Sequence, residues 1–117
     1  MKTYSIRSRN LFNETLKNGT KVITGSVIVL YTKRPVQEGE TAQFGVGIIT
    51  SKKTFGKAVE RNFVKRRVRA AIRQVVSAIP SISTNIDIVC IGRKRLATGK
   101  FADFVKELNM AVSNLSL

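Results

Sequence analysis

Apolar residues recur every three or four positions near both ends of the chain, and this spacing predicts two amphipathic helices. The first is expected to run from a Ser8 cap to about Asn18, with Gly19 as its stop signal. The second covers 100–115, where seven apolar residues repeat at helical spacing. We expect the second helix to pack its apolar side against a sheet.

Short runs of β-branched and aromatic residues between these segments predict strands. Two such runs stand at 27–32 and 44–51, separated by a loop with one proline and one glycine, and a weaker extended segment at 21–24 is placed at the sheet edge. Residues 86–91 are apolar on both faces, which indicates a strand buried between two layers. The pattern leaves open whether this last strand pairs parallel or antiparallel.

The segment 56–74, GKAVERNFVKRRVRAAIRQ, combines a dense run of cations with regularly spaced valines. At 100° per residue, one sector of its helical wheel is apolar, as expected of a core-facing stripe, and it holds Val64, Val68, Ala71, Ile72, Val75 and Ile79. A polar sector about 130° away holds Asn62, Arg66, Arg69 and Arg73, with Lys65 between the two. The pattern predicts a helix that is anchored by its valines and presents its arginines outward as a rigid row.

The predicted elements follow the order helix, strands, basic helix, strand and helix, without an internal repeat or a linker. We therefore expect an α+β fold: a single-domain sandwich over 1–117, with one mixed sheet of about four strands packed with three helices. A chain of 117 residues buries about two thirds of its unfolded surface, which is enough for a core of its own.

The net charge of the chain limits the kinds of partner that it is expected to bind. The chain has 21 Lys and Arg against 7 Asp and Glu, a net charge of +14, which indicates a polyanionic partner such as nucleic acid or an acidic membrane surface. A membrane is less favoured, because the core needs the apolar side of the basic helix. Between 52 and 73, Glu60 is the only acid beside nine Lys and Arg, whereas a merely solvated helix usually mixes signs. The loop before the helix adds cations and amides suited to phosphate at Ser51, Lys52, Lys53, Gly56 and Lys57.

Other features argue against targeting, redox and nucleotide-binding roles. The N-terminus lacks the apolar core of a secretory signal, and the longest aliphatic run, 27–30, is too short to span a membrane, so a cytoplasmic location is expected. Cys90 is the only cysteine and is interpreted as a core residue. Gly56-Lys57 does not complete a P-loop, because Ala58 follows where a hydroxyl is required.

Catalysis by the protein itself has little support in the sequence. The absence of histidine excludes histidine acid–base cleavage of RNA. The acids show no close pairing of the kind that a two-metal nuclease uses; they are Glu14, Glu38, Glu40, Glu60, Asp87, Asp103 and Glu107. No catalytic or metal-binding residue is therefore assigned.

Several short motifs follow one another through the basic segment: Lys52-Lys53, FGKAV at 55–59, Arg61-Asn62, Lys65-Arg66 and Arg69. This succession resembles the signature helix of the bacterial ribonuclease P protein subunit, and the resemblance extends over most of the chain, as far as Asp87-Ile88-Val89 and Arg93-Lys94. It implies a small α/β sandwich that binds a catalytic RNA and the 5′ leader of precursor tRNA. In that family the RNA cleaves the phosphodiester bond with magnesium and so produces the mature tRNA 5′ end.

The resemblance also implies which residues meet each partner. Contacts to the RNA subunit are expected at Lys52, Lys53, Lys57, Arg61, Asn62, Lys65, Arg66 and Arg69, and the helical wheel adds Arg73. The leader is expected in a cleft between the sheet and the N-terminal helix, at Phe12, Leu16 and Tyr31. Mg²⁺ is expected to be held mainly by RNA, none by the protein alone, and no obligate protein partner is evident.

The sequence departs from the family pattern in three places. Leu16 replaces an aromatic residue, Glu60 places an acid inside the motif, and no proline follows Arg93-Lys94. Two other functions stay open at this point. A structural RNA-binding protein, such as a small ribosomal protein, would share the charge and the rigid basic helix. A stand-alone nuclease would need acids that meet in space although they are distant in sequence.

Overall fold

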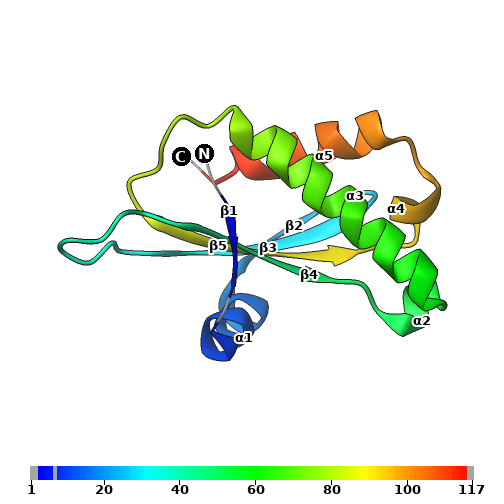
Figure 1. Ribbon diagram of the computed structural model, residues 1–117, viewed down its shortest axis with the longest axis horizontal. Helices are drawn as coiled ribbons and strands as arrows, with labels where there is room; N and C mark the ends of the chain where they lie inside the picture. Colours follow the sequence, from blue (N-terminus) through cyan, green and yellow to red (C-terminus); the bar gives the residue numbers. More distant parts are fainter. Residues whose placement is uncertain (1–2, 7, 116–117) are drawn as a thin grey trace.

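The computed structural model describes residues 3–6 and 8–115, and within these residues five strands form one sheet (Figure 1). The strands are β1 (Thr3–Ser5), β2 (Thr20–Ile23), β3 (Val27–Arg34), β4 (Phe44–Ile49) and β5 (Asn85–Gly92). They lie in the order β1-β4-β5-β3-β2. The sheet is mixed, as predicted: β5 pairs parallel with β4 and antiparallel with β3, and β1 pairs parallel with β4.

Helices cover the two faces of this sheet unequally. They are α1 (Arg9–Asn18), α2 (Lys52–Phe55), α3 (Ala58–Ser77), α4 (Arg95–Thr98) and α5 (Phe101–Ser113). The long helices α3 and α5 lie over one face, whereas the short α1 lies over the other (Figure 1). We refer to these below as the α3/α5 face and the α1 face.

The main core lies between the sheet and the helices of the α3/α5 face. Alternate residues of the strands point into it, and those at its centre are at most 1% exposed: Val27, Val29, Phe44, Ile86 and Ile88. The apolar stripe predicted for the basic helix is confirmed, because Val64, Val68, Ala71, Ile72 and Val75 are buried; Ile79 lies beyond the end of α3 and is partly buried against the same core. The C-terminal helix contributes Phe104 and Leu108.

Two further predictions are confirmed by local contacts. The Ser8 hydroxyl accepts the N–H of Leu11 at 3.3 Å as the α1 cap, and the N–H of Gly19 donates to the Thr15 carbonyl at 3.0 Å where the helix ends. Cys90 is fully buried in the core, and this desolvation raises the pKa of its thiol to about 12. The thiol is therefore protonated at neutral pH and behaves as an apolar packing group.

The prediction of about four strands and three helices was too low, since the described residues form five of each. It missed β1, α2 and α4. Both α2 and α4 are single turns of four residues, too short to show a helical repeat. The strand β1 has only three residues, and its partner β4 begins about forty residues later, so no local pattern announces the pairing.

Candidate nucleic-acid interface

A sharp bend between α2 and α3 places three lysines beside the start of the basic helix. The Ser51 hydroxyl accepts the N–H of Thr54 at 3.1 Å and caps α2. Gly56 then ends α2 with a φ of 71°, which is a conformation that favours glycine. Its carbonyl accepts a hydrogen bond from the Arg61 guanidinium, which fixes that side chain against the bend. The segment predicted as a loop is therefore a short helix and a bend, with Lys52, Lys53 and Lys57 all exposed.

Helix α3 carries the predicted cations on the sides that face away from the core. Asn62, Arg66, Arg69 and Arg73 are exposed, and Lys65 is half-buried at their flank. In the part of the chain that the structure describes, the one ion pair is Arg34 with Asp87, so none of these α3 cations is neutralised by a neighbouring acid. Like charges this close repel one another, and an anionic ligand would relieve that repulsion.

A groove of about 330 Å³ runs between α3 and the edge of the sheet formed by β1 and β4. Three cations one helical turn apart, Lys65, Arg69 and Arg73, line its helix side. The opposite side and the floor come from Thr3, Ser5, Val46, Gly47, Ile48 and Ile72. The groove thus joins a row of cations to two hydroxyls and an apolar floor, a combination that suits the phosphates and sugars of one nucleic-acid strand.

Arg67 lies on the same helix but serves a different purpose. Its guanidinium donates to the carbonyls of Leu96 at 3.0 Å and Gly99 at 2.8 Å, so it holds the end of α4 against α3. It also lies 5.3 Å from the ring centroid of Phe63. The helical wheel gave Arg67 no role, because only the folded position of α4 shows that this arginine has intramolecular partners.

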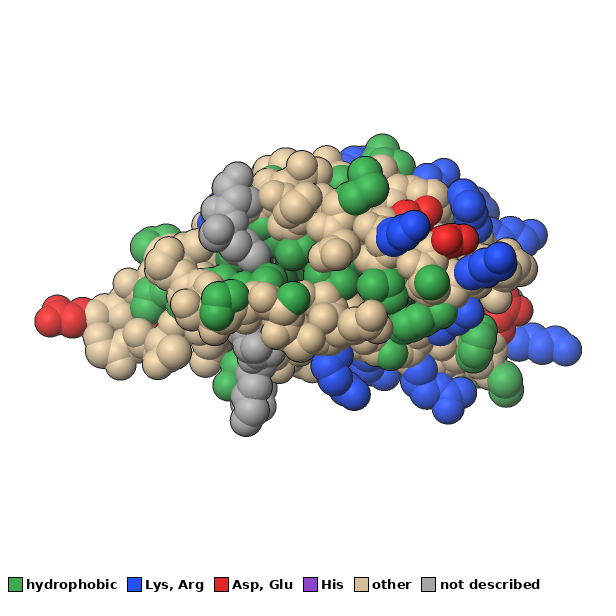
Figure 2. Space-filling model, turned by 90° about the horizontal axis from the view of Figure 1, so that it is seen from above, with side chains coloured by type: hydrophobic (Ala, Val, Ile, Leu, Met, Phe, Trp, Pro, Cys, Tyr) green, Lys and Arg blue, Asp and Glu red, His purple; other side chains and the backbone are tan. Residues whose placement is uncertain are grey.

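The positive charge gathers at one end of the molecule. In Figure 2, Lys and Arg side chains crowd the right-hand half, which carries α2, the start of α3 and α4 in Figure 1. The opposite tip, formed by the connection between β3 and β4, shows an acidic side chain instead. A polyanion approaching the molecule would be steered toward the end where α2 and α3 meet.

The α1 face carries a second surface, which is apolar, whereas the groove beside α3 is lined by cations. Here Phe12 packs so closely on β4 that a Cβ added at Gly47 would lie 2.5 Å from its Cε2 atom. Beyond α1, four isoleucines stand side by side across four strands, each paired with the next in the register of the sheet: Ile23, Ile28, Ile91 and Ile49. Ile23 is 62% exposed and the other three are half-buried. Sequence reasoning missed this isoleucine row, because only the strand register brings its members together.

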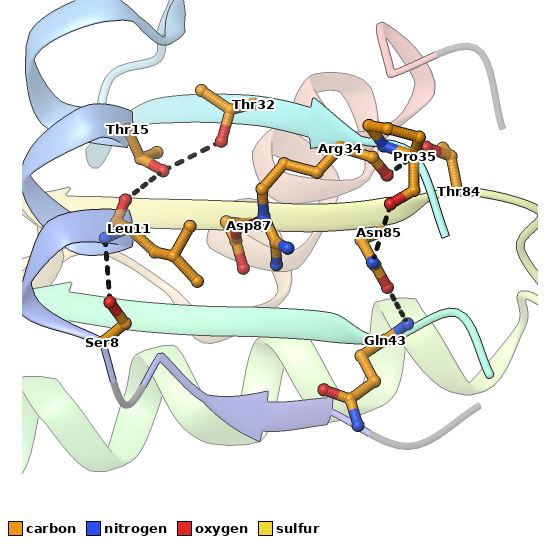
Figure 3. Close-up of polar contacts among 10 residues, drawn as sticks. All are labelled: Ser8, Leu11, Thr15, Thr32, Arg34, Pro35, Gln43, Thr84, Asn85 and Asp87. Carbon is orange, nitrogen blue, oxygen red and sulfur yellow. Dashed lines mark hydrogen bonds and ion pairs between the residues drawn. The ribbon is translucent and has the colours of Figure 1, made fainter. Parts of the chain in front are cut away.

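Polar contacts fix the rest of this face (Figure 3). The hydroxyls of Thr15 and Thr32 share a hydrogen bond of 3.0 Å that ties α1 to β3. Nearby, Arg34 Nε donates to Asp87 Oδ2 at 2.8 Å, and Asp87 is buried. Asn85 accepts the N–H of Gln43 at 2.8 Å and so joins β5 to the start of β4. The threonine pair thus holds α1 on the sheet, and the other two contacts join β5 to β3 and to the residue before β4.

Tyr31 does not share a cleft with Phe12 and Leu16, contrary to the expectation from the sequence. It pairs with Ile88 across the sheet and packs against the core of the α3/α5 face, and its hydroxyl donates to the Asn114 carbonyl at 3.3 Å. It lines a separate hollow of about 450 Å³ at the edge of β3. The run 27–32 is apolar on both sides, so the sequence did not reveal which face each residue occupies. Asn18, at the end of α1, lines the same hollow, which places Tyr31 just around the sheet edge from α1.

The described residues contain no cluster of three or more Asp, Glu, His or Cys side chains placed to hold a metal ion. The acids that could bind magnesium are instead dispersed, and Asp87 is engaged by Arg34. Over the same residues, no helix combines the length and the apolar character needed to cross a membrane.

Comparisons of this chain with a family model, with known sequences and with solved structures agree with one another. The family model Ribonuclease P matches residues 1–116. The ribonuclease P protein component of Mesoplasma florum is 32% identical over 113 residues, which is 96% of this chain and 96% of that protein. Among solved structures, the RNase P protein of Staphylococcus aureus matches with a TM-score of 0.71 and 25% identity, over 97% of this chain and 96% of that one. The protein from Thermotoga maritima matches with a TM-score of 0.68 and 31% identity, over 89% and 90%.

Proposed function

The chain belongs to the ribonuclease P protein family, and from this premise we propose that the exposed side of α3 binds the catalytic RNA of the ribonucleoprotein. The protein is a subunit in tRNA 5′ processing, it takes part in the endoribonuclease activity of ribonuclease P, and it has an RNA partner. A purely structural RNA-binding role is not favoured. The proposal concerns which surfaces meet which RNA.

The observation that carries the proposal is the unneutralised row of cations on a helix that the core holds rigid. Arg66, Arg69 and Arg73 project from the side opposite to Val64 and Val68, which are fully buried. Cations held in this way lose little conformational entropy when they bind phosphate. Lys52, Lys53, Lys57, Arg61, Asn62 and Lys65 extend the proposed surface around the bend and into the groove.

We propose that the 5′ leader of precursor tRNA follows the α1 face. Phe12 and Leu16 are both half-buried there, and the isoleucine row continues the apolar surface across the sheet. Unpaired bases pack well against such apolar and aromatic side chains. A leader that passes the end of α1 would turn around the edge of β3 and meet Tyr31 in its separate hollow. Tyr31 is therefore proposed as a contact for a more distant part of the leader.

The chemistry itself is assigned to the RNA. The dispersed acids of the described residues do not fit a protein-held magnesium site, so we propose that RNA holds the Mg²⁺ ions of the cleavage reaction. The protein contributes positive charge where two RNA molecules approach each other, which lowers the magnesium concentration needed for cleavage. The proposed setting is the bacterial cytoplasm, where precursor tRNA is made.

The central experiment measures precursor tRNA cleavage at low magnesium with this protein, a bacterial ribonuclease P RNA, and both together, and maps the 5′ end of the product. Cleavage at the mature 5′ end is expected to be far faster in the combined reaction. Cleavage by the protein alone would mean that its acids are catalytic after all. Tight RNA binding without any acceleration would return the protein to a structural role.

Charge-neutralising variants test the α3 surface directly. For Arg66→Gln and Arg69→Gln, we expect weaker binding of the RNA subunit and a slope of log affinity against log salt that is smaller by about one unit or less per lost phosphate contact. Lys106→Gln is the matched control, because Lys106 is also exposed but lies on α5. If the folded Arg66 and Arg69 variants keep the parent slope, these residues do not contact the RNA.

A further inference from the structure

The cationic face of α3 contains two apolar side chains that the core does not use. Val59 is 77% exposed and Phe63 is 43% exposed. They are four residues apart and therefore neighbours on the helix surface. Asn62 and Arg66 stand beside them, three residues from Val59 and from Phe63 respectively, so the apolar pair lies within the surface proposed for RNA.

The Phe63 ring is contacted by a neighbouring cation. The Arg67 guanidinium lies 5.3 Å from its centroid, within the range of a cation–π contact. That guanidinium is itself fixed by its hydrogen bonds to the carbonyls of Leu96 and Gly99, and it also lies 6.0 Å from the centroid of the Phe101 ring. The ring therefore has a preset orientation, and its exposed surface is available to a ligand at little cost in side-chain entropy.

We propose that Phe63 stacks against an unpaired base of the RNA subunit, with Val59 as the adjoining apolar contact. The inference rests on the function proposed above, since it places this base next to the phosphates bound by α3. Charge complementarity selects the occupant, because an apolar patch bordered by unneutralised arginines suits a nucleobase whose own phosphates reach those arginines. A base stacked here would fix the position of the RNA along α3, whereas the cations alone would tolerate sliding.

The proposal predicts a binding signature that differs from that of the arginines. Phe63→Leu keeps an apolar side chain but removes the ring, and we expect its affinity for a bacterial ribonuclease P RNA to fall about tenfold. The slope of log affinity against log salt is expected to stay at the parent value, because no phosphate contact is lost. Thermal unfolding of the variant alone checks that the fold is retained.

Tryptophan fluorescence gives a direct readout of stacking, since the natural chain contains no tryptophan. Phe63→Trp is expected to lose emission when a bacterial ribonuclease P RNA is added, because a base stacks on the indole. Met110→Trp is the matched control: Met110 is an exposed apolar residue on α5, 71% exposed, and its variant is expected to keep its emission.

Three outcomes would overturn the proposal. If Phe63→Leu binds the RNA subunit as tightly as the parent and the emission of Phe63→Trp does not change, Phe63 makes no base contact. The proposed function is tested separately, by the salt slopes of the Arg66 and Arg69 variants. Quenching by precursor tRNA but not by the RNA subunit would assign the base to the substrate. Self-association of the parent that Phe63→Leu abolishes without changing RNA affinity would make the patch a contact between copies of this chain.

Discussion

Both faces of the sheet carry apolar residues, but these residues serve different purposes on the two faces. On the α3/α5 face, two long helices from separate parts of the chain bury strand residues such as Phe44 and Ile88, while Val46 and Ile48 of β4 are half-buried beside the groove. On the α1 face, one ten-residue helix covers Leu30 and Val89, which are buried, but leaves the isoleucine row partly open. The comparison suggests that the first face supplies most of the stability, whereas the second keeps apolar surface for a ligand.

The same contrast applies to charge. The α3/α5 face turns its cations outward on α3, where no acid of the described residues pairs with them. The α1 face instead holds the buried Asp87 with its partner Arg34. The side of α3 proposed for RNA thus carries a row of cations, whereas on the α1 face the described ion pair, Arg34 with Asp87, is set among apolar residues. For the proposed binding of two RNA molecules this division is useful, because phosphates and unpaired bases require different surfaces.

The largest expected effect on the free energy of unfolding comes from a cavity in the core of the α3/α5 face. Phe104 is 1% exposed, and Phe104→Ala is expected to lower the free energy of unfolding by about 3–5 kcal/mol. Ile23→Ala, on the α1 face, is the comparison, and its loss is expected to stay within about 0.5 kcal/mol because Ile23 is 62% exposed. Urea unfolding followed by circular dichroism measures both. Similar losses from the two variants would remove the distinction between the faces.

A smaller effect is expected where α1 meets the sheet. Gly47→Ala places a methyl group where the Phe12 ring lies, so the ring must move, and the free energy of unfolding should fall by about 1–3 kcal/mol. Adding Phe12→Leu to this variant is expected to recover part of the loss, since the smaller side chain makes room. The difference between the double variant and the sum of the singles measures this coupling. Strictly additive losses would mean that α1 adjusts as a whole.

Sequence reasoning recovered the elements whose signals are local. The valine stripe of α3, the Ser8 cap and the buried strand around Cys90 are each encoded by residues close together in the chain, and the structure confirms them. The motifs of the basic segment also led to the family that the comparisons establish. Apart from the Ser8 cap of α1, these successes concern the core of the α3/α5 face and the helix that RNA is proposed to bind.

What sequence reasoning missed depends on contacts between distant segments. The isoleucine row exists only in the register of four strands, and β1 exists only beside β4. Arg66 and Arg67 are adjacent and chemically identical, yet among the described residues only the Arg67 side chain has hydrogen-bond partners, because α4 ends beside it. Tyr31 was placed with Phe12 on the basis of the family resemblance. Its own strand is apolar on both sides and therefore carries no sign of which side faces which layer.

The smallest effects are expected from substitutions of Phe12 and Tyr31, which lie on opposite faces of the sheet. In the ribonucleoprotein, Phe12→Leu is expected to weaken binding of precursor tRNA with a leader by about 1 kcal/mol, the lower end of the range for a lost base contact, without changing the binding of mature tRNA. Tyr31→Leu is expected to act in the same direction but less strongly, and only on leaders long enough to pass the end of α1. Because the two rings lie on opposite faces, their effects should add. A larger effect at Tyr31, already present with short leaders, would instead place the leader in the hollow beside β3 and leave the isoleucine row without a ligand.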